Sequence, residues 1–312
     1  DIIIGGAFTI SGTAFTSTSA AMELQGDAAF TGGSFTHHNG LVRFNDAAAE
    51  NITGTSPGFY DLEFTGRGSS YTISSTGNID VANSLIISGT SSYTLNAGTI
   101  NLSGDLNLTN TATGDGGTTT IAFVGTTDQD IISALPVNEN SLPAIRINKS
   151  GGTLRFPALI TVCGNWTYTA GTMDVSTNHS TIVFAKTLTI SGNSHTLNNV
   201  VFEGNSNWTF TINTGTVLTV TGTLTTNGAS GVFINTPVAG ATAIQAQGDV
   251  LVSNTSTTGG GNGLILINGT GSQAMTSTAS ASQGLLPYIK IQKTAGTLTL
   301  QGAISESRNW VW

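Results

Sequence analysis

Apolar and polar residues alternate strictly along many short stretches of this chain. The stretch 100–108 reads apolar-x-apolar-x-Gly-x-apolar-x-apolar, and the same order recurs at 160–168 and at 218–226. Alternation with a period of two predicts β-strands that bury one face and expose Thr, Ser and Asn on the other. A Gly between two such strands predicts a sharp corner with positive φ. Each stretch is therefore expected to form a strand, a corner and a second strand.

The positions of the apolar residues around this Gly predict which side chains form the core. All of them share one parity, so they are expected to point into one column. The predicted core residues are Ile100, Leu102, Leu106, Ile160, Val162, Trp166, Leu218, Val220 and Leu224.

The spacing of the copies predicts stacked coils. One copy starts at Ile79 and the next at Ile100, an interval that suits a single bare rung, whereas the wider interval to Ile160 predicts further rungs or loops. A second pattern, apolar-x-apolar closely followed by Gly, occurs at 22–26, 62–66 and 200–204 and is extended at 145–149 and 289–293. Its charged residues, with Lys149 and Lys293 among them, are expected to lie on the outward, solvated face.

The chain also repeats itself at a fixed long offset. When 125–168 is laid over 269–312 without a gap, 15 of the 44 positions are identical, and we call this displacement the long-repeat offset. A long repeat filled with short strands indicates supersecondary units that stack on one another. The sequence therefore predicts an all-β fold, a right-handed parallel β-helix (β-solenoid) with loop excursions. Residues 1–312 are expected to form a single continuous solenoid, as a segment or subunit of a larger assembly.

Four segments are expected to depart from the strand pattern. The Ala-rich stretches 46–50 and 275–283 are each compatible with one helical turn in a loop. Segments 128–142 and 272–286 occupy equal lengths in the two long repeats but differ in composition. This difference predicts surface excursions, where a binding site would most naturally lie.

The composition narrows the classes of partner. Only 8% of the residues are charged, against about 25% in an ordinary soluble domain. The net charge is −8 and the nine Lys and Arg residues do not cluster, which argues against nucleic acid and anionic membranes as partners. No stretch approaches the ~20 apolar residues of a membrane-spanning helix, so membrane insertion is not expected. With Cys163 as its single, bystander cysteine, the chain suits a secreted bacterial protein stabilised without disulfides.

Candidate catalytic residues are few. Enzymes built on parallel β-helices cleave acidic polysaccharides, and glycoside hydrolysis needs two facing carboxylates. The pairs Asp61/Glu63 and Asp128/Asp130 could each share a strand face, but we expect neither pair to have a His or Arg partner nearby. The stretch 146–149 matches a basic motif of pectin hydrolases only loosely, and it recurs at 290–293. We therefore predict no catalytic residues and no enzymatic activity.

Metal, cofactor and sugar sites are also weakly indicated. The four histidines, His37, His38, His179 and His195, lack metal-ligand spacing, and 37–40 is most simply a polar turn. No cofactor is expected. Trp166 and Trp310 take repeat positions filled elsewhere by Leu, which favours a core role over an exposed sugar platform. Ice binding, a remote alternative, needs regular files of outward Thr, and their spacing here is irregular.

A resemblance to a known class rests on 149–154 (Lys-Ser-Gly-Gly-Thr-Leu), 160–166 (Ile-Thr-Val-Cys-Gly-Asn-Trp) and 170–172 (Ala-Gly-Thr). Together these segments resemble the repeats of very large bacterial cell-surface proteins in the style of filamentous-haemagglutinin adhesins. The resemblance implies a right-handed β-helix that serves as an extracellular stalk, fibre or adhesive surface and not as a catalyst. The alternative function is a polysaccharide-binding or polysaccharide-cleaving β-helix.

The two ends of the sequence predict a mode of assembly. The chain opens directly in strand-like residues, and Trp312 aligns with Tyr168 in mid-repeat. An uncapped rung offers unpaired backbone groups to a further strand. We therefore expect either covalent continuation in a larger chain or head-to-tail self-association, with surface carbohydrate as a further partner. The residues expected to mediate end-to-end assembly are Ile2, Ile3, Ile4, Trp310 and Trp312.

Overall fold

The computed structural model describes residues 1–75, 78–114, 116–134, 136, 139 and 141–311. Within these residues all regular structure is β, helices are absent, and strands of successive coils pair in parallel, so the chain is a parallel β-solenoid as predicted. The described part of the chain accordingly contains no helix long and apolar enough to span a membrane. It divides into two compact units, 1–161 with 170–174 and 162–169 with 175–312. The expectation of one continuous solenoid stays a prediction.

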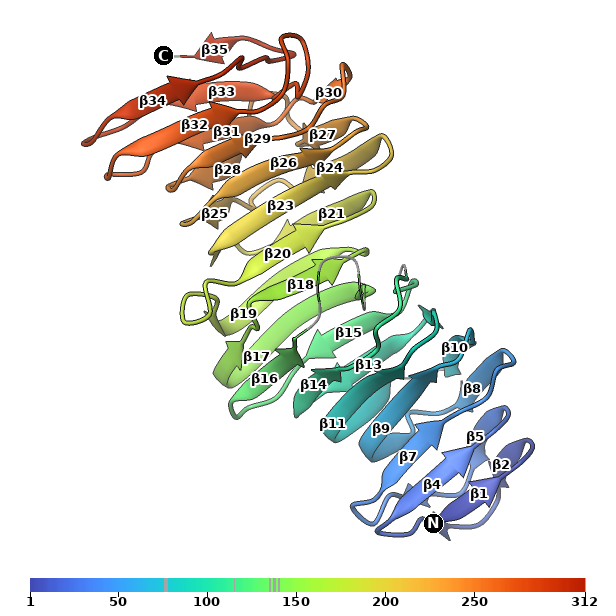
Figure 1. Cartoon of the computed structure of the whole chain (residues 1–312). Helices are drawn as coiled ribbons and strands as arrows, with labels where there is room; N and C mark the ends of the chain where they lie inside the picture. Colours follow the sequence, from blue (N-terminus) through green and yellow to red (C-terminus); the bar gives the residue numbers. More distant parts are fainter. Residues whose placement is uncertain (76–77, 115, 135, 137–138, 140, 312) are drawn as a thin grey trace. The chain divides into compact units, whose positions relative to one another are not determined.

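The N-terminal unit is built from one long sheet and two shorter ones (Figure 1). The long sheet has the order β1-β4-β7-β9-β11-β13-β15-β17, and β14 and β16 pair beside it; the others are β12-β10-β8-β5-β2 and β3-β6. The strands are β1 (Ile2–Ile4), β2 (Phe8–Ser11), β3 (Phe15–Thr16), β4 (Ala21–Leu24), β5 (Ala28–Gly32), β6 (Phe35–Thr36), β7 (Leu41–Phe44), β8 (Glu50–Gly54), β9 (Gly58–Gly66), β10 (Ser70–Ser75), β11 (Ile79–Gly89), β12 (Thr94–Asn96), β13 (Thr99–Leu102), β14 (Asp105–Leu108), β15 (Thr120–Phe123), β16 (Gln129–Ser133) and β17 (Ala144–Arg155).

The C-terminal unit has three stacks of parallel strands. Their orders are β20-β23-β26-β29-β32-β34, β22-β25-β28-β31-β33-β35 and β19-β21-β24-β27-β30. The strands are β20 (Thr181–Phe184), β21 (Leu188–Gly192), β22 (His195–Leu197), β23 (Asn199–Gly204), β24 (Trp208–Ile212), β25 (Leu218–Val220), β26 (Leu224–Gly228), β27 (Val232–Asn235), β28 (Thr242–Ala246), β29 (Val250–Val252), β30 (Gly259–Gly260), β31 (Leu264–Ile267), β32 (Gln273–Ser277), β33 (Tyr288–Ile291), β34 (Leu298–Gln301) and β35 (Trp310–Val311). Strands β18 (Leu159–Val162) and β19 (Trp166–Asp174) carry residues of both units.

The strand–corner–strand units lie where the alternation predicts them. Strands β13 and β14 flank Gly104, and β25 and β26 flank Gly222. Ile79 pairs with Ile100, and Ile100 with Ile121, so the short interval between copies is one rung. The copy that starts at Ile79 differs, because β11 runs through its corner as one strand with a shift of register.

The predicted core is confirmed within each unit. All nine predicted core residues are at most 4% exposed. Aromatic rings continue the column from rung to rung: Phe44 stacks on its strand partner Phe64 at 5.6 Å, and Phe184 on its partner Phe202 at 5.7 Å. Each large buried side chain contributes about 1.5–3 kcal/mol before the entropy of folding is subtracted.

The corner glycines have a different role from the predicted one. Gly104 and Gly222 do not have positive φ, so the expectation was wrong there, although Gly192 does, at 94°. A Cβ on Gly104 would lie 1.7 Å from the carbonyl oxygen of Asn83, and one on Gly222 would lie 2.3 Å from Oδ1 of Asn199. The glycine therefore lets the backbone of one rung approach its neighbour, which any side chain would prevent.

Neither expected helical turn is present, because 46–50 is bend and strand, and 275–283 is strand, bend and a hydrogen-bonded turn in which Ser282 has a φ of 66°. Residues 46–50 lead through a bend into β8, and 275–283 begins inside β32. Segments 128–142 and 272–286 are not excursions at their starts, because β16 and β32 fill 129–133 and 273–277. Met275 shows why this segment is a strand in spite of its local helix propensity: the side chain is fully buried, and its residue pairs with Val250 and Leu300 of the neighbouring rungs.

Candidate functional site

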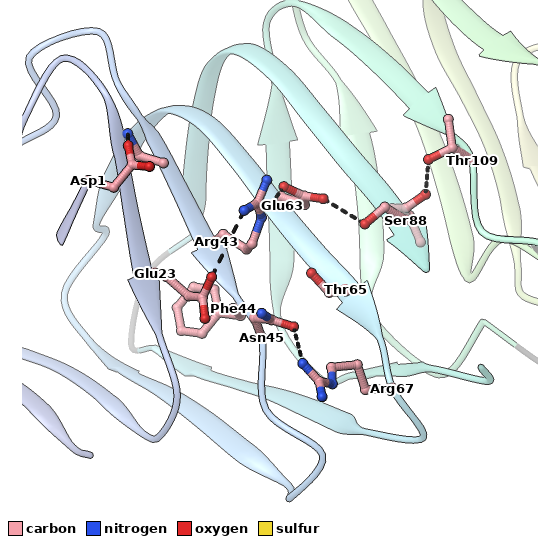
Figure 2. Close-up of polar contacts among 12 residues, drawn as sticks. Asp1, Glu23, Arg43, Phe44, Asn45, Glu63, Thr65, Arg67, Ser88 and Thr109 are labelled. Carbon is pink, nitrogen blue, oxygen red and sulfur yellow. Dashed lines mark hydrogen bonds and ion pairs between the residues drawn. The ribbon is translucent and has the colours of Figure 1, made fainter. Parts of the chain in front are cut away.

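A row of charged side chains crosses the outward face of the long sheet in the N-terminal unit, and Figure 2 shows it in close-up. Glu23, Arg43 and Glu63 occupy matching positions of β4, β7 and β9. Nε of Arg43 donates to Oε2 of Glu63 at 2.6 Å, and its Nη1 lies 3.9 Å from Oε2 of Glu23. Oε1 of Glu63 accepts a hydrogen bond from the hydroxyl of Ser88 on β11 at 2.6 Å. We call these four residues the charged ladder.

The charged ladder ties neighbouring rungs together. Its cation lies between two anions, and the side chains of Arg43, Glu23 and Glu63 are 35%, 17% and 10% exposed. Partial burial reduces the screening that weakens ion pairs at open surfaces. The expectation that the Asp61/Glu63 pair has no basic partner was therefore wrong for Glu63. Asp61 accepts a hydrogen bond from the amide of Asn83 at 2.7 Å.

The second carboxylate pair also has an arginine. Nη1 of Arg155 lies 3.4 Å from Oδ1 of Asp130, and its Nη2 donates to Oδ2 of Asp128. The sequence missed this partner because it belongs to a later rung, and only the pairing of β17 with β16 places it beside the carboxylates. The backbone N–H of Thr153, then Arg155, holds the pKa of the Asp128 carboxyl below its usual value. A general acid needs a raised pKa, so the arrangement favours a fixed ion pair over acid catalysis.

A third polar file lies on the same sheet, across β11, β13, β15 and β17. The residues in register are Asp80, Asn101, Ala122 and Arg146. The Asn101 amide donates to Oδ1 of Asp80 at 2.8 Å, and Nη2 of Arg146 donates to Oδ1 of Asn101 at 3.5 Å. Arg146 therefore reaches past the small side chain of Ala122, which is fully buried although it occupies an outward position.

Lys149 is buried, and the expectation of a solvated outward position was wrong. Its side chain is 2% exposed, and Nζ donates to the carbonyls of Gly125 and Thr127 and to Oε1 of Gln129. Nε2 of Gln129 donates in turn to the carbonyls of Leu102 and Gly104. Burial lowers the pKa of the Lys149 ammonium, and the nearby Asp128 carboxylate opposes this effect. We call this arrangement the lysine–glutamine clamp.

The C-terminal unit contains the same clamp. Lys293 donates to the carbonyls of Gly269 and Gly271 and to Oε1 of Gln273. Gln273 donates to the carbonyls of Ala246 and Gly248. Lys293 is half-buried, so its expected solvation is also corrected. Sequence reasoning missed both glutamines, although their identity across the long-repeat offset was an available signal.

The shared polar framework extends before the repeat found in the sequence. Asp105 and Asp249 each accept a bond from the backbone N–H of the next rung, at 2.8 Å in both units. The amides of Asn110 and Asn254, both almost fully buried, each donate to two backbone carbonyls. These pairs are also related by the long-repeat offset, so the two units repeat their buried polar contacts as well as their core.

Glu50 is a buried carboxyl group that the sequence did not single out. It is 1% exposed, and neither carboxylate oxygen has a hydrogen-bond partner among the described residues. Burial, then the Asp46 and Asp27 carboxylates, raise its pKa to about 8. Glu50 pairs in register with Tyr71, whose hydroxyl donates to the Thr65 carbonyl at 2.6 Å. At neutral pH this carboxyl therefore holds its proton.

The histidines belong to turns and to the core. The 37–40 segment is a polar turn as predicted: Gly40 N–H donates to the His37 carbonyl, and His38 and Asn39 have φ of 45° and 58°. His195 is buried, and its Nε2 accepts a hydrogen bond from the indole of Trp166 at 3.0 Å. Burial lowers the pKa of His195, which favours the neutral ring that can accept this hydrogen bond. The core role predicted for Trp166 is confirmed.

In the described part of the chain, the outward threonines of β21, β24 and β27 do not form long rows. Thr189 pairs with Thr211, but the next rung has Asn235, and Thr209 is followed by Phe233. A flat array of hydroxyls is therefore interrupted after two rungs, which weakens the ice-binding alternative.

The residues expected at the assembly ends lie on edge strands. β1 pairs with β4 on one side only within the described chain, and Ile2 and Ile3 are 39% and 66% exposed. Ile2 and Ile4 have the core parity of Met22 and Leu24, whereas Ile3 lies in the outward file of Glu23. Trp310 on β35 is half-buried and its indole donates to Glu306. Trp312 lies outside the described residues.

Other proteins add nothing to this geometry. No protein-family model, curated protein or solved structure matches the chain. Within the described residues, no group of three or more His, Cys, Asp and Glu side chains is placed to hold a metal ion.

Proposed function

We propose that this protein is a non-catalytic structural and adhesive β-solenoid that acts outside the cell as part of a surface fibre. One observation carries the proposal: among the described residues, polar side chains in both units bond from one rung to the next. The charged ladder, the Arg155 ion pairs and the lysine–glutamine clamps all connect neighbouring coils.

Such contacts suit a solenoid that resists separation of its coils. Each rung shares backbone hydrogen bonds and core side chains only with its neighbours, so coils could be peeled away one by one. A buried lysine that binds two carbonyls and a glutamine holds three parts of adjacent coils at one point. Hydrogen bonds to charged groups contribute about 1.5–3 kcal/mol each, so the clamps oppose local opening.

An extracellular setting and assembly into fibres are parts of the same proposal. Low charge, one cysteine and abundant Thr, Ser and Asn favour secretion over the cytosol. The outer edge of β1 can accept one more parallel strand, supplied by further chain or by a second copy. Fractionation of the source cells is expected to find the protein at the surface or in the medium.

Turnover assays test the absence of catalysis. The protein is incubated with polygalacturonate, alginate and β-glucan, with and without Ca²⁺, and new reducing ends and unsaturated uronates are measured. We expect no product above a buffer control. Reproducible cleavage that is lost in Asp61→Asn or Asp128→Asn would overturn the proposal and support the polysaccharide-cleaving alternative.

A further inference from the structure

A shallow groove lies beside the Asp80–Asn101–Arg146 file in the N-terminal unit. Its floor includes the buried side chains of Phe59 and Val81, and its polar lining is His37, Asp80, Asn101 and Ser103. Its volume is about 250 Å³, below the roughly 300–1,000 Å³ of pockets that enclose drug-sized molecules. The groove can therefore take one ring or a short length of polymer.

The polar groups along the groove are held in place before any ligand arrives. Arg146 donates to Asn101, and Asn101 donates to Asp80, so the amide orientation and one carboxylate oxygen are fixed. Asp80 is exposed, which leaves its carboxylate accessible to a ligand's hydroxyl groups. Preorganised groups lose little entropy when they bind.

His37 provides a donor beside an aromatic ring. Its Nδ1 accepts a hydrogen bond from the Asn39 N–H at 3.1 Å, so the proton of the neutral imidazole is on Nε2. The imidazole packs against the ring of Tyr60 at 5.6 Å. Tyr60 is not part of the groove lining, so the contribution of this pair to the groove is the Nε2–H of His37, which can donate to a sugar hydroxyl.

From this geometry we infer that the groove binds a neutral, hydroxyl-rich glycan chain. A sugar ring has hydroxyls that both donate and accept, which match a carboxylate, an amide, a hydroxyl and an imidazole N–H in one groove. An acidic glycan is disfavoured, because it would approach the Asp80 carboxylate on a protein of net charge −8. The inference rests on the adhesive part of the proposed function and names its ligand class.

The C-terminal unit does not repeat the groove chemistry. At the long-repeat offset, Asn101, Ala122 and Arg146 correspond to Gln245, Leu266 and Lys290. Leu266 occupies the place where Ala122 gives Arg146 its path to Asn101, and Gln245 accepts a bond from Asn268 instead. The two units therefore share the lysine–glutamine clamp and the core but differ in the residues of this surface. We assign the site to the N-terminal unit alone.

The test is a titration of the whole chain followed by amide NMR. The probes are maltohexaose, cellohexaose and mannohexaose, with hexagalacturonate as the acidic comparison. We expect saturable shifts in the amides of 80–82 and 101–103 with at least one neutral hexasaccharide, and weaker or no shifts with hexagalacturonate. The absence of saturable shifts with all three neutral probes, or tighter binding of hexagalacturonate, would overturn the inference.

Two variants and a control locate the site. Asp80→Asn keeps an oxygen for the Asn101 amide but loses the charge, and it is expected to weaken binding about ten- to a hundredfold. His37→Ala is expected to weaken it as well. Asp249→Asn makes the same charge change at an exposed position of the C-terminal unit and should leave affinity unchanged. Equal affinity in wild type, Asp80→Asn and His37→Ala contradicts the groove assignment.

The same samples keep this inference separate from the proposed function. Binding without turnover supports both. Turnover of a bound glycan contradicts the non-catalytic proposal, whereas the groove remains a binding site. The absence of both binding and turnover contradicts the inference alone.

Discussion

Glu50 makes the stability of the N-terminal unit depend on pH. Its folded pKa of about 8 lies above the ordinary value of 4.5, so between these values the folded state holds a proton that the unfolded chain releases. Stability is then greatest below the lower value and falls as pH rises through the window. A variant that lacks the Glu50 carboxyl group should therefore lack this contribution to the pH dependence of the free energy of unfolding.

We predict that Glu50→Gln flattens this dependence. Relative to wild type, its free energy of unfolding should rise by about 1.4 kcal/mol per pH unit between pH of about 5 and 8. Denaturant melts at a series of pH values measure the difference. Asp46→Asn should lower the upper limit of the window, because it removes the second-largest cause of the raised pKa. Parallel wild-type and Glu50→Gln curves would contradict the assignment.

Gly104 is expected to tolerate no side chain. Gly104→Ala places a Cβ against the Asn83 carbonyl oxygen, a backbone atom that cannot turn away, and should cost about 3 kcal/mol or more. Gly12→Ala is the matched control, because nothing lies within 4 Å of its added Cβ. Chemical denaturation compares the two. Similar losses in both variants would show that close approach is not the reason for glycine at the corner.

The charged ladder should show unequal coupling energies between its neighbouring strands. A double-mutant cycle of Arg43→Met with Glu63→Gln is expected to give about 1 kcal/mol, because these side chains meet at 2.6 Å and are partly buried. The cycle of Arg43→Met with Glu23→Gln, across 3.9 Å, should give less than about 0.5 kcal/mol. Both are read from urea denaturation. A larger coupling for Glu23, or none in either cycle, argues against the ladder.

The alternation of apolar and polar residues predicts only part of this strand architecture. The alternation of apolar and polar residues on both sides of Gly104 was enough to predict the corner between β13 and β14, because the inward positions are apolar. The outward residues carried no such signal. Arg155 meets Asp128 only after two rungs have stacked, and Lys149 is buried only because Gln129 and backbone carbonyls surround its ammonium. Such contacts depend on register between coils, which local periodicity leaves undetermined.

For the whole molecule, the open edge of β1 predicts association that depends on Ile2 and Ile3. If a second copy supplies the next strand, light scattering should show mass that increases with concentration. Ile2→Lys and Ile3→Lys should reduce it, because charges at an edge strand oppose pairing. Val238→Lys, at an exposed apolar residue of the C-terminal unit, is the control. A monomer across the whole concentration range contradicts self-association.

The placement of the basic residues has a consequence for proteolysis. A trypsin-like protease needs an extended, unpaired backbone around a Lys or Arg side chain that can enter its pocket. Five of the nine basic residues lie within strands, and Lys149 among them is buried. The other four, Arg67, Lys186, Lys293 and Arg308, lie outside the strands, so cleavage would have to begin at one of these positions. A chain built in this way can persist among secreted proteases without a disulfide to protect it.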